Sequence, residues 1–209
     1  MNQPAAMVME PPFLRENWKK VLASATKESY RYVRVLNGVA SVTNGHVLLR
    51  SPLQMADGFY HISTQNELFP ATPFGYLSYP DFEQVRPPFA KMTPFCEIRC
   101  NAPVNSTLTL IDAMSALCQT AKRVLANIVI DKQGMFWQQN TNEFLSFPFN
   151  TPSEVVLNAG SLALVLDDLR RYDVVYLSRE DRSDFSEMPL VFGLDWARCA
   201  LIHTLPGTR

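Results

Sequence analysis

The chain has 209 residues, 47% of them hydrophobic and 19% charged, and its formal net charge is −1. This composition excludes a disordered chain and a protein coated all over in positive charge, but it leaves room for a local basic face. No apolar run approaches the roughly 20 residues that span a bilayer. Residues 1–12 lack the basic start and apolar core of a signal peptide, so we expect a flexible tail on a cytoplasmic protein with no membrane contact.

The residue types that carry catalysis or bind metals are not arranged as sites. Cys96, Cys100, Cys118 and Cys199 form no CxxC pair, so reduced and mostly buried thiols are expected. The three histidines lack metal-ligand spacing, and no GxSxG elbow or phosphate-cradling glycine loop occurs. We therefore expect no enzyme, no metal and no cofactor, while Ser-His-Asp or Cys-His groups that meet only in space stay open.

Residues 13–27 are expected to form the first helix. Its apolar face, at helical spacing, consists of Leu14, Trp18, Val21, Leu22 and Ala25. Its polar side carries Arg15, Lys19, Lys20 and Lys27. Two interpretations of this charge stay open: a solvated surface with snorkelling lysines, or a surface that faces phosphates.

An antiparallel meander is expected next. Strands are predicted at 30–36, 39–42, 46–50 and 59–62. Asn37-Gly38 and Asn44-Gly45 join the first three, because both residue types tolerate the positive φ of a tight hairpin turn. Repeated prolines between residues 70 and 94 then exclude long helices and interior strands. Residues 64–95 are therefore the expected boundary between a first domain, 13–93, and a second, 94–209.

The second half predicts two helices among strands. The first helix is expected at 107–122, capped by Asn105 or Ser106 and ending in Lys122-Arg123. The second is expected to be capped by Asn158 or Ser161 and to end in Arg170-Arg171, where cations suit the helix dipole. Strands are predicted at 95–100, 124–130, 135–139, 144–149, 155–157, 174–178, 190–194 and 200–203. This order predicts an α+β domain with two helices on one face of an antiparallel sheet.

Three segments resemble the sliding clamps of DNA replication, of the bacterial polymerase III beta-subunit type. Residues 41–52, SVTNGHVLLRSP, look like the clamp strand–turn–strand with a Thr-Asp-Gly-His turn, although Asn44 replaces the acidic residue. Residues 79–88, YPDFEQVRPP, are similar to the aromatic-Pro-Asp-aromatic segment that ends in Val-x-Pro. Residues 157–178, followed by MPLVF and ALIHTLP, resemble the last clamp helix and strands.

The resemblance implies a DNA-clamp-like α+β fold, with antiparallel sheets and helices packed on one face. It implies sequence-independent contact with duplex DNA through loosely held cations on the inner helices, and a pocket between domains that holds short peptides of a polymerase or other replication protein. Carried over by position, the DNA-binding candidates are Arg15, Lys19, Lys20, Lys27, Lys122, Arg123, Arg170 and Arg171. Asp167 and Asp168 lie beside Arg170 and Arg171 in the sequence, and their negative charge makes this pair a weaker phosphate-binding surface.

The chain departs from the family in size. A beta-type subunit has three domains, whereas this chain has room for two, and residues 13–93 lack an obvious second helix and are read as a reduced domain. A ring of six such domains needs three chains, so a homo-oligomer, specifically a trimer, is expected. A small divergent chain of this kind suits a phage or mobile-element protein. The alternative is a clamp-fold protein–protein interaction module that does not bind DNA.

Overall fold

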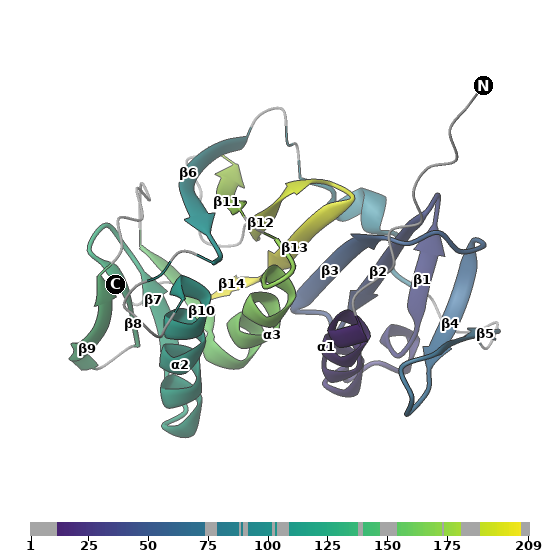
Figure 1. Ribbon diagram of the computed structural model, residues 1–209, viewed down its shortest axis with the longest axis horizontal. Coiled ribbons are helices and arrows are strands. Elements are labelled where there is room, and N and C mark those ends of the chain that lie inside the picture. Colours follow the sequence, from purple (N-terminus) through teal and green to yellow (C-terminus); the bar gives the residue numbers. More distant parts are fainter. Residues whose placement is uncertain are drawn as a thin grey trace.

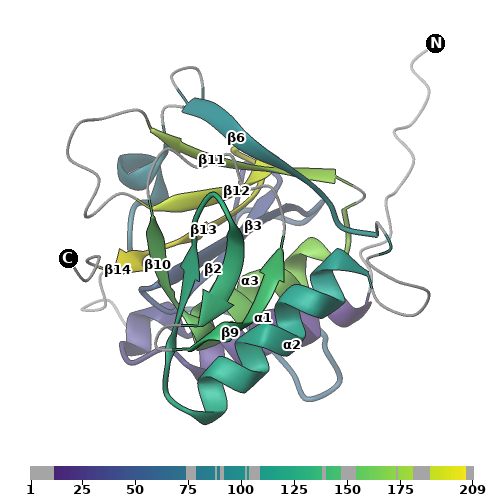
Figure 2. The same ribbon diagram turned by 90° about the vertical axis from the view of Figure 1, so that its left-hand side faces the viewer.

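The computed structural model describes residues 12–73, 79–87, 89, 92–101, 103, 109–137, 140–146, 154–172, 174–180 and 189–205. In these residues the strands form two antiparallel sheets, and three α-helices lie on one side of the larger sheet (Figure 1, Figure 2). The arrangement confirms the α+β fold class, with antiparallel sheets and helices packed on one face. No helix in the described ranges is long and apolar enough to cross a membrane.

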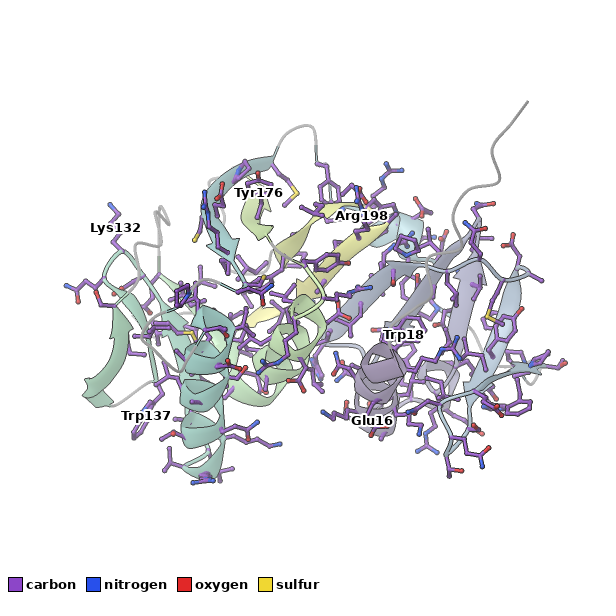
Figure 3. The ribbon with its side chains drawn as sticks, in the orientation of Figure 1. Glu16, Trp18, Lys132, Trp137, Tyr176 and Arg198 are labelled. Atoms are coloured by element: carbon purple, nitrogen blue, oxygen red, sulfur yellow. The ribbon has the colours of Figure 1, made fainter. Side chains whose placement is uncertain are left out.

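The first half contributes one helix and five strands. They are α1 (Pro12–Ala23), β1 (Val33–Leu36), β2 (Val39–Thr43), β3 (Val47–Pro52), β4 (Gly58–Ile62) and β5 (Leu68–Ala71), with 3₁₀ turns η1 (Glu28–Tyr30) and η2 (Phe82–Val85). Trp18 is 1% exposed and belongs to the core beneath α1, whereas Glu16 is exposed on the helix (Figure 3). The helix ends at Ala23 rather than at residue 27, so Lys27 lies outside it.

The hairpin turns of the meander are formed by the Asn-Gly pairs that predicted them. Asn37 and Gly38 adopt φ of +52° and +72° between β1 and β2, which confirms the expected turn. In the next turn, Asn44 Oδ1 accepts from the N–H groups of His46 and Val47, both at 2.9 Å. The first strand begins only at Val33, later than expected, because Tyr30 is wound into η1 and residues 31–32 form a bend.

The second half contributes two helices and nine strands within the described residues. They are β6 (Met92–Arg99), α2 (Leu110–Arg123), β7 (Asn127–Ile130), β8 (Gly134–Trp137), β9 (Asn140–Ser146), β10 (Val155–Asn158), α3 (Ala159–Leu169), β11 (Val174–Glu180), β12 (Leu190–Asp195), β13 (Arg198–Ile202) and β14 (Thr204–Leu205). Each predicted strand of this half overlaps one of these, with shifted ends.

The two helices of the second half begin at side-chain caps. Asn158 Oδ1 accepts from the Ser161 N–H at 3.0 Å, which confirms Asn158 as the cap of α3. Helix α2 begins later than expected, because Thr109 caps it in a capping box with Asp112. The two residues predicted to cap α2, Asn105 and Ser106, lie outside the described residues.

The strands of the second half do not form the single sheet that was expected. The larger sheet has the order β5-β4-β1-β2-β3-β13-β12-β11-β6, and the smaller has the order β14-β10-β7-β8-β9. Helix α2 is buried along a broad face, at Leu110, Ile111, Met114, Cys118 and Ala121. It packs against α3 on one side and against β7, β8 and β9 on the other, so two layers are needed to cover it.

Antiparallel pairing of β3 with β13 makes the larger sheet continuous through both halves of the chain. Alternation along β13 places Ile202 toward the helices and Leu201 on the opposite, outer face. The outer face carries its own apolar cluster, formed by Leu48, Phe82, Val191, Trp196, Cys199 and Leu201. This second cluster lies on the sheet side away from the helices, and it builds the floor of the site described next.

Candidate partner-binding groove and helix face

The β2–β3 turn is held in shape by its own side chains. Thr43 Oγ1 donates to the Val47 carbonyl oxygen at 2.7 Å and accepts from the Gly45 N–H at 3.0 Å. Gly45 has a φ of +96°, and a Cβ added there would lie 3.2 Å from Cε2 of Tyr30. Any side chain at this position meets backbone strain and an aromatic ring together, so the turn favours glycine.

The Tyr79–Pro87 stretch of the YPDFEQVRPP segment lies over the outer face of the sheet. Asp81 caps η2 by accepting from the Glu83 N–H at 3.1 Å. Phe82 is 6% exposed within the outer cluster, and the Tyr79 ring meets it edge to face with centroids 5.4 Å apart. Tyr79 is anchored by donating its hydroxyl to the Tyr32 carbonyl oxygen at 3.1 Å, and burial raises the pKa of this phenol.

Both segments line one cavity of about 460 Å³, together with the C-terminal strands. Its wall includes Leu48 of the first segment, Phe82 and Pro87 of the second, and Val191, Leu201 and His203 from the end of the chain. His203 is held there by donating its N–H to the His46 carbonyl oxygen at 2.9 Å. We call this cavity the docking groove.

The docking groove suits apolar side chains. Leucine, valine, proline, phenylalanine and methionine form more than half of its wall, and its lining also includes the exposed His46 and His203. An open, mostly apolar cavity with a few polar groups is typical of sites that accept part of a ligand or peptide. The described residues contain no group of three His, Cys, Asp or Glu side chains that could hold a metal ion.

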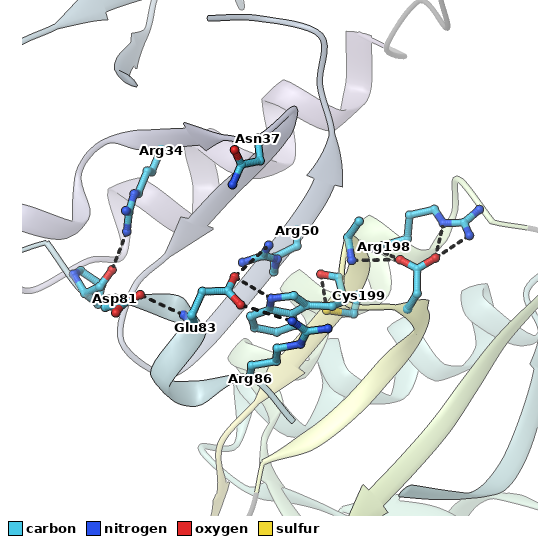
Figure 4. Close-up of polar contacts among 12 residues, drawn as sticks. Arg34, Asn37, Arg50, Asp81, Glu83, Arg86, Arg198 and Cys199 are labelled. Carbon is cyan, nitrogen blue, oxygen red and sulfur yellow. Dashed lines mark hydrogen bonds and ion pairs between the residues drawn. The ribbon is translucent and has the colours of Figure 1, made fainter. Parts of the chain in front are cut away.

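A second cavity, also of about 460 Å³, lies on the same outer face and is lined by Arg34, Arg50 and Arg86. We call it the arginine cavity (Figure 4). The Arg50 guanidinium stacks on the Trp196 ring, with its Cζ 3.9 Å from the ring centroid, and burial lowers the pKa of Arg50. Trp196 Nε1 donates to Glu83 Oε1 at 2.8 Å.

The cations expected on the first helix are turned toward the protein itself. Arg15 donates from Nη1 to the Asn66 carbonyl oxygen at 2.9 Å, and Lys19 donates from Nζ to the Thr64 carbonyl oxygen at 2.8 Å. Lys20 Nζ lies 3.1 Å from Asp167 Oδ2 on α3. Lys27 lies beyond the helix with Nζ 5.4 Å from the Tyr30 ring centroid.

The two arginines at the end of α3 also have internal partners. Arg170 pairs with Asp112 at the start of α2. The Arg171 side chain is only 8% exposed. It donates from Nη2 to the Arg50 carbonyl oxygen at 3.0 Å and to Asp168 Oδ2 at 2.8 Å. The Arg171 guanidinium is therefore a buried structural link between α3 and β3, which disfavours Arg171 as a phosphate contact.

Lys122 and Arg123 differ from the other candidates. Both are exposed at the C-terminal end of α2, and neither contacts a carboxylate within the described part of the chain. The eight candidates therefore do not form one basic surface. Most have an acceptor or an aromatic ring within the protein, whereas Lys122 and Arg123 have no ion pair in the described part of the chain.

Sequence reasoning reached the docking groove through its two motifs but did not single out Arg50 or Trp196. A signal for Arg50 was present, since it follows Leu48 by two positions in an apolar strand and therefore shares its outer face. Trp196 lies between β12 and β13, and only the folded sheet brings it against Arg50.

Antiparallel sheets with helices on one side describe the fold of this chain. Solved bacterial clamps share it. A DNA polymerase sliding clamp from Bacillus subtilis is 11% identical at a TM-score of 0.51, covering 100% of this chain and 67% of that one. A sliding clamp from Pseudomonas aeruginosa is 13% identical at a TM-score of 0.52, with 99% and 69% covered.

A third solved structure, the DNA polymerase III subunit beta from Borrelia burgdorferi in complex with a natural product, is 12% identical at a TM-score of 0.50. The alignment covers 94% of this chain and 61% of that one, so the chain spans about three fifths to two thirds of the length of these clamps. These likenesses show a divergent sliding-clamp-like fold. No protein-family model and no curated protein matches the sequence.

Proposed function

We propose that the chain is a clamp-fold docking protein that holds an extended segment of a partner protein through apolar side chains in the docking groove. The observation that carries this proposal is the convergence of both clamp-like segments and the C-terminal strands on one apolar cavity. The solved neighbours are named as clamps or subunits of a DNA polymerase. The partner class that fits this fold is therefore a polymerase or another replication protein.

The groove is suited to an extended peptide because its floor is a sheet and its side is a fixed 3₁₀ turn. Leu48, Val191 and Leu201 project from three neighbouring strands, and Phe82 of η2 is fixed above them. Fixed apolar walls favour binding because little conformational entropy is lost when a peptide docks.

The proposal can be tested with a displayed random-peptide library selected on the immobilised full chain. We expect enrichment of peptides with neighbouring apolar or aromatic residues. Met92→Glu places a carboxylate at the groove wall and should weaken the selected peptides about tenfold or more, because an unpaired charge must be desolvated. Gln133→Glu, an exposed position outside the groove wall, adds the same charge and should leave binding unchanged. Equal binding by both variants contradicts docking in this groove.

Duplex DNA contact along the helix side of the larger sheet is a second candidate function. Two observations favour it. Helices α1, α2 and α3 lie on the same side of the larger sheet (Figure 1), and Lys122 and Arg123 are exposed. The contact is proposed as sequence-independent, through phosphates, and the salt titration in the Discussion tests it. It is compatible with peptide docking because the groove lies on the opposite face of the sheet.

A further inference from the structure

The arginine cavity carries more positive than negative charge. Arg34, Arg50 and Arg86 line it with Asp81, Glu83 and Asp195. Asp195 is neutralised by Arg198, whose guanidinium donates to it twice. Asp81 and Glu83 therefore face three guanidinium groups, which leaves one positive charge in excess at this place on the outer face.

Glu83 is shared among several donors rather than committed to one arginine. Its Oε1 accepts from Trp196 Nε1 at 2.8 Å and lies 3.8 Å from Arg50 Nη2, and its Oε2 lies 3.6 Å from Arg86 Nη1. These two arginine distances exceed those of a close charge-assisted hydrogen bond, which are about 2.7–2.9 Å. Both guanidinium groups therefore retain capacity for a second acceptor.

Arg50 is the residue that makes this cavity a built site. It is 7% exposed, it lies flat on Trp196, and its buried Nε has no hydrogen-bond partner. A buried cation with an unsatisfied donor costs free energy unless an acceptor reaches it. A planar guanidinium fixed by stacking is also well suited to bind a carboxylate in a defined geometry.

The arginine cavity adjoins the docking groove, since Phe82 and Arg86 line both. We infer that it is a carboxylate subsite for the same partner peptide: a segment whose apolar residues fill the docking groove places an Asp or Glu side chain beside Arg50, Arg86 and Arg34. The inference rests on the proposed function and adds a specificity for acidic peptides. A carboxylate fits better than a phosphate dianion, because Asp81 and Glu83 repel the larger charge.

The library selection tests this inference directly. Peptides recovered on the wild-type chain should carry Asp or Glu at a fixed spacing from their apolar residues. Arg34→Gln removes a guanidinium group that lines the arginine cavity but not the docking groove, and it should weaken the preference for an acid while leaving the apolar preference. A synthetic acidic peptide should then bind the Arg34→Gln variant about tenfold more weakly, whereas its Asp→Asn form should bind both proteins alike. Arg99→Gln is the matched control, since Arg99 is an exposed arginine that lines neither cavity.

The outcomes separate the two proposals. Apolar peptides with no acidic preference overturn the carboxylate subsite and leave the docking groove standing. No enriched peptide at all overturns the docking function and this inference with it. Retention of the full acidic preference in the Arg34→Gln variant overturns the subsite as placed here. Inorganic phosphate that competes with the acidic peptide at low millimolar concentration would show a general anion site rather than one for a peptide carboxylate.

Discussion

Arg50 and Arg171 stabilise the same end of β3 from opposite sides of the sheet. Arg171 reaches up from α3 and donates to the Arg50 carbonyl oxygen and to Ser51 Oγ. The Arg50 side chain itself leaves the strand on the outer face and stacks on Trp196. Neither cation was recognisable as buried from its position in the sequence, because Arg171 follows a helix like an ordinary surface arginine and only tertiary packing closes over it.

Gly193 stands at a position in the larger sheet that has no room for a side chain. It lies at an irregularity in the pairing of β12 with β13, and an added Cβ would lie 2.6 Å from the Arg198 carbonyl oxygen and 2.6 Å from Cys199 Cβ. We predict that Gly193→Ala lowers the free energy of unfolding by about 2 kcal/mol or more, because backbone and a buried thiol must shift. Chemical denaturation monitored by tryptophan fluorescence measures this.

Gly38→Ala provides the control for Gly193→Ala. Gly38 has a φ of +72° but nothing within 4 Å of an added Cβ. Only the left-handed backbone then opposes a side chain, and the expected loss is about 1 kcal/mol. A Gly193→Ala protein as stable as the Gly38→Ala protein would show that the β12–β13 irregularity relaxes without cost.

At the scale of elements, local patterns predicted most helices and strands but not their partners. The Asn-Gly pairs marked the β1–β2 and β2–β3 hairpins, and apolar spacing placed α2 and α3. Alternation tells which residues of a strand share a face, but it does not tell which strand lies alongside. The β3–β13 pairing joins residues that are far apart in the chain, such as Leu48 and Leu201, and no local sequence pattern predicts it.

The same limit explains the outcome for the helix cations. Helical spacing placed Lys19 and Lys20 away from the apolar face of α1, but their acceptors come from the β4–β5 loop and from α3. Charge on a polar helix side is therefore a poor guide to a phosphate surface until the neighbouring elements are known. The end of α2 differs because Lys122 and Arg123 are exposed in its last turn.

We predict that Lys122 and Arg123 contribute more to duplex DNA binding than Lys19 and Lys20. For each cation that no longer meets a phosphate, the slope of log affinity against log salt should fall by about 0.9. Lys122→Gln with Arg123→Gln should flatten the slope by about 1–2, whereas Lys19→Gln with Lys20→Gln should change it less, because those ammonium groups already have acceptors. A salt titration with duplex DNA of two unrelated sequences measures both. Absence of binding by the wild type at low salt would remove the DNA candidate and leave peptide docking.

At the scale of the whole molecule, sheet edges decide how copies can associate. The larger sheet ends in β5 and β6, and the smaller ends in β14 and β9. Pro70 lies in β5 and Pro94 in β6, so each of these edges lacks one backbone N–H. A proline is tolerated on an edge strand where its missing donor faces outward, and it then blunts pairing with another chain.

The trimer expected from the clamp resemblance stays a prediction. The edge strands of the two sheets specify which strands would have to pair between copies. Closure of a ring by head-to-tail pairing joins two different edges. Two such pairings are β9, the longer edge of the smaller sheet, with β5 or β6 of the next copy, and β5 of one copy with β6 of the next. We expect a weak, concentration-dependent trimer by multi-angle light scattering, because one hydrogen bond is missing at the blunted edge. Pro70→Val restores a donor on β5 and should lower the concentration at which the trimer forms, whereas Pro94→Val does the same if β6 is the edge used. A wild-type chain that stays monomeric at every concentration, and remains so in both variants, contradicts a ring and favours a clamp fold that works as a single docking module.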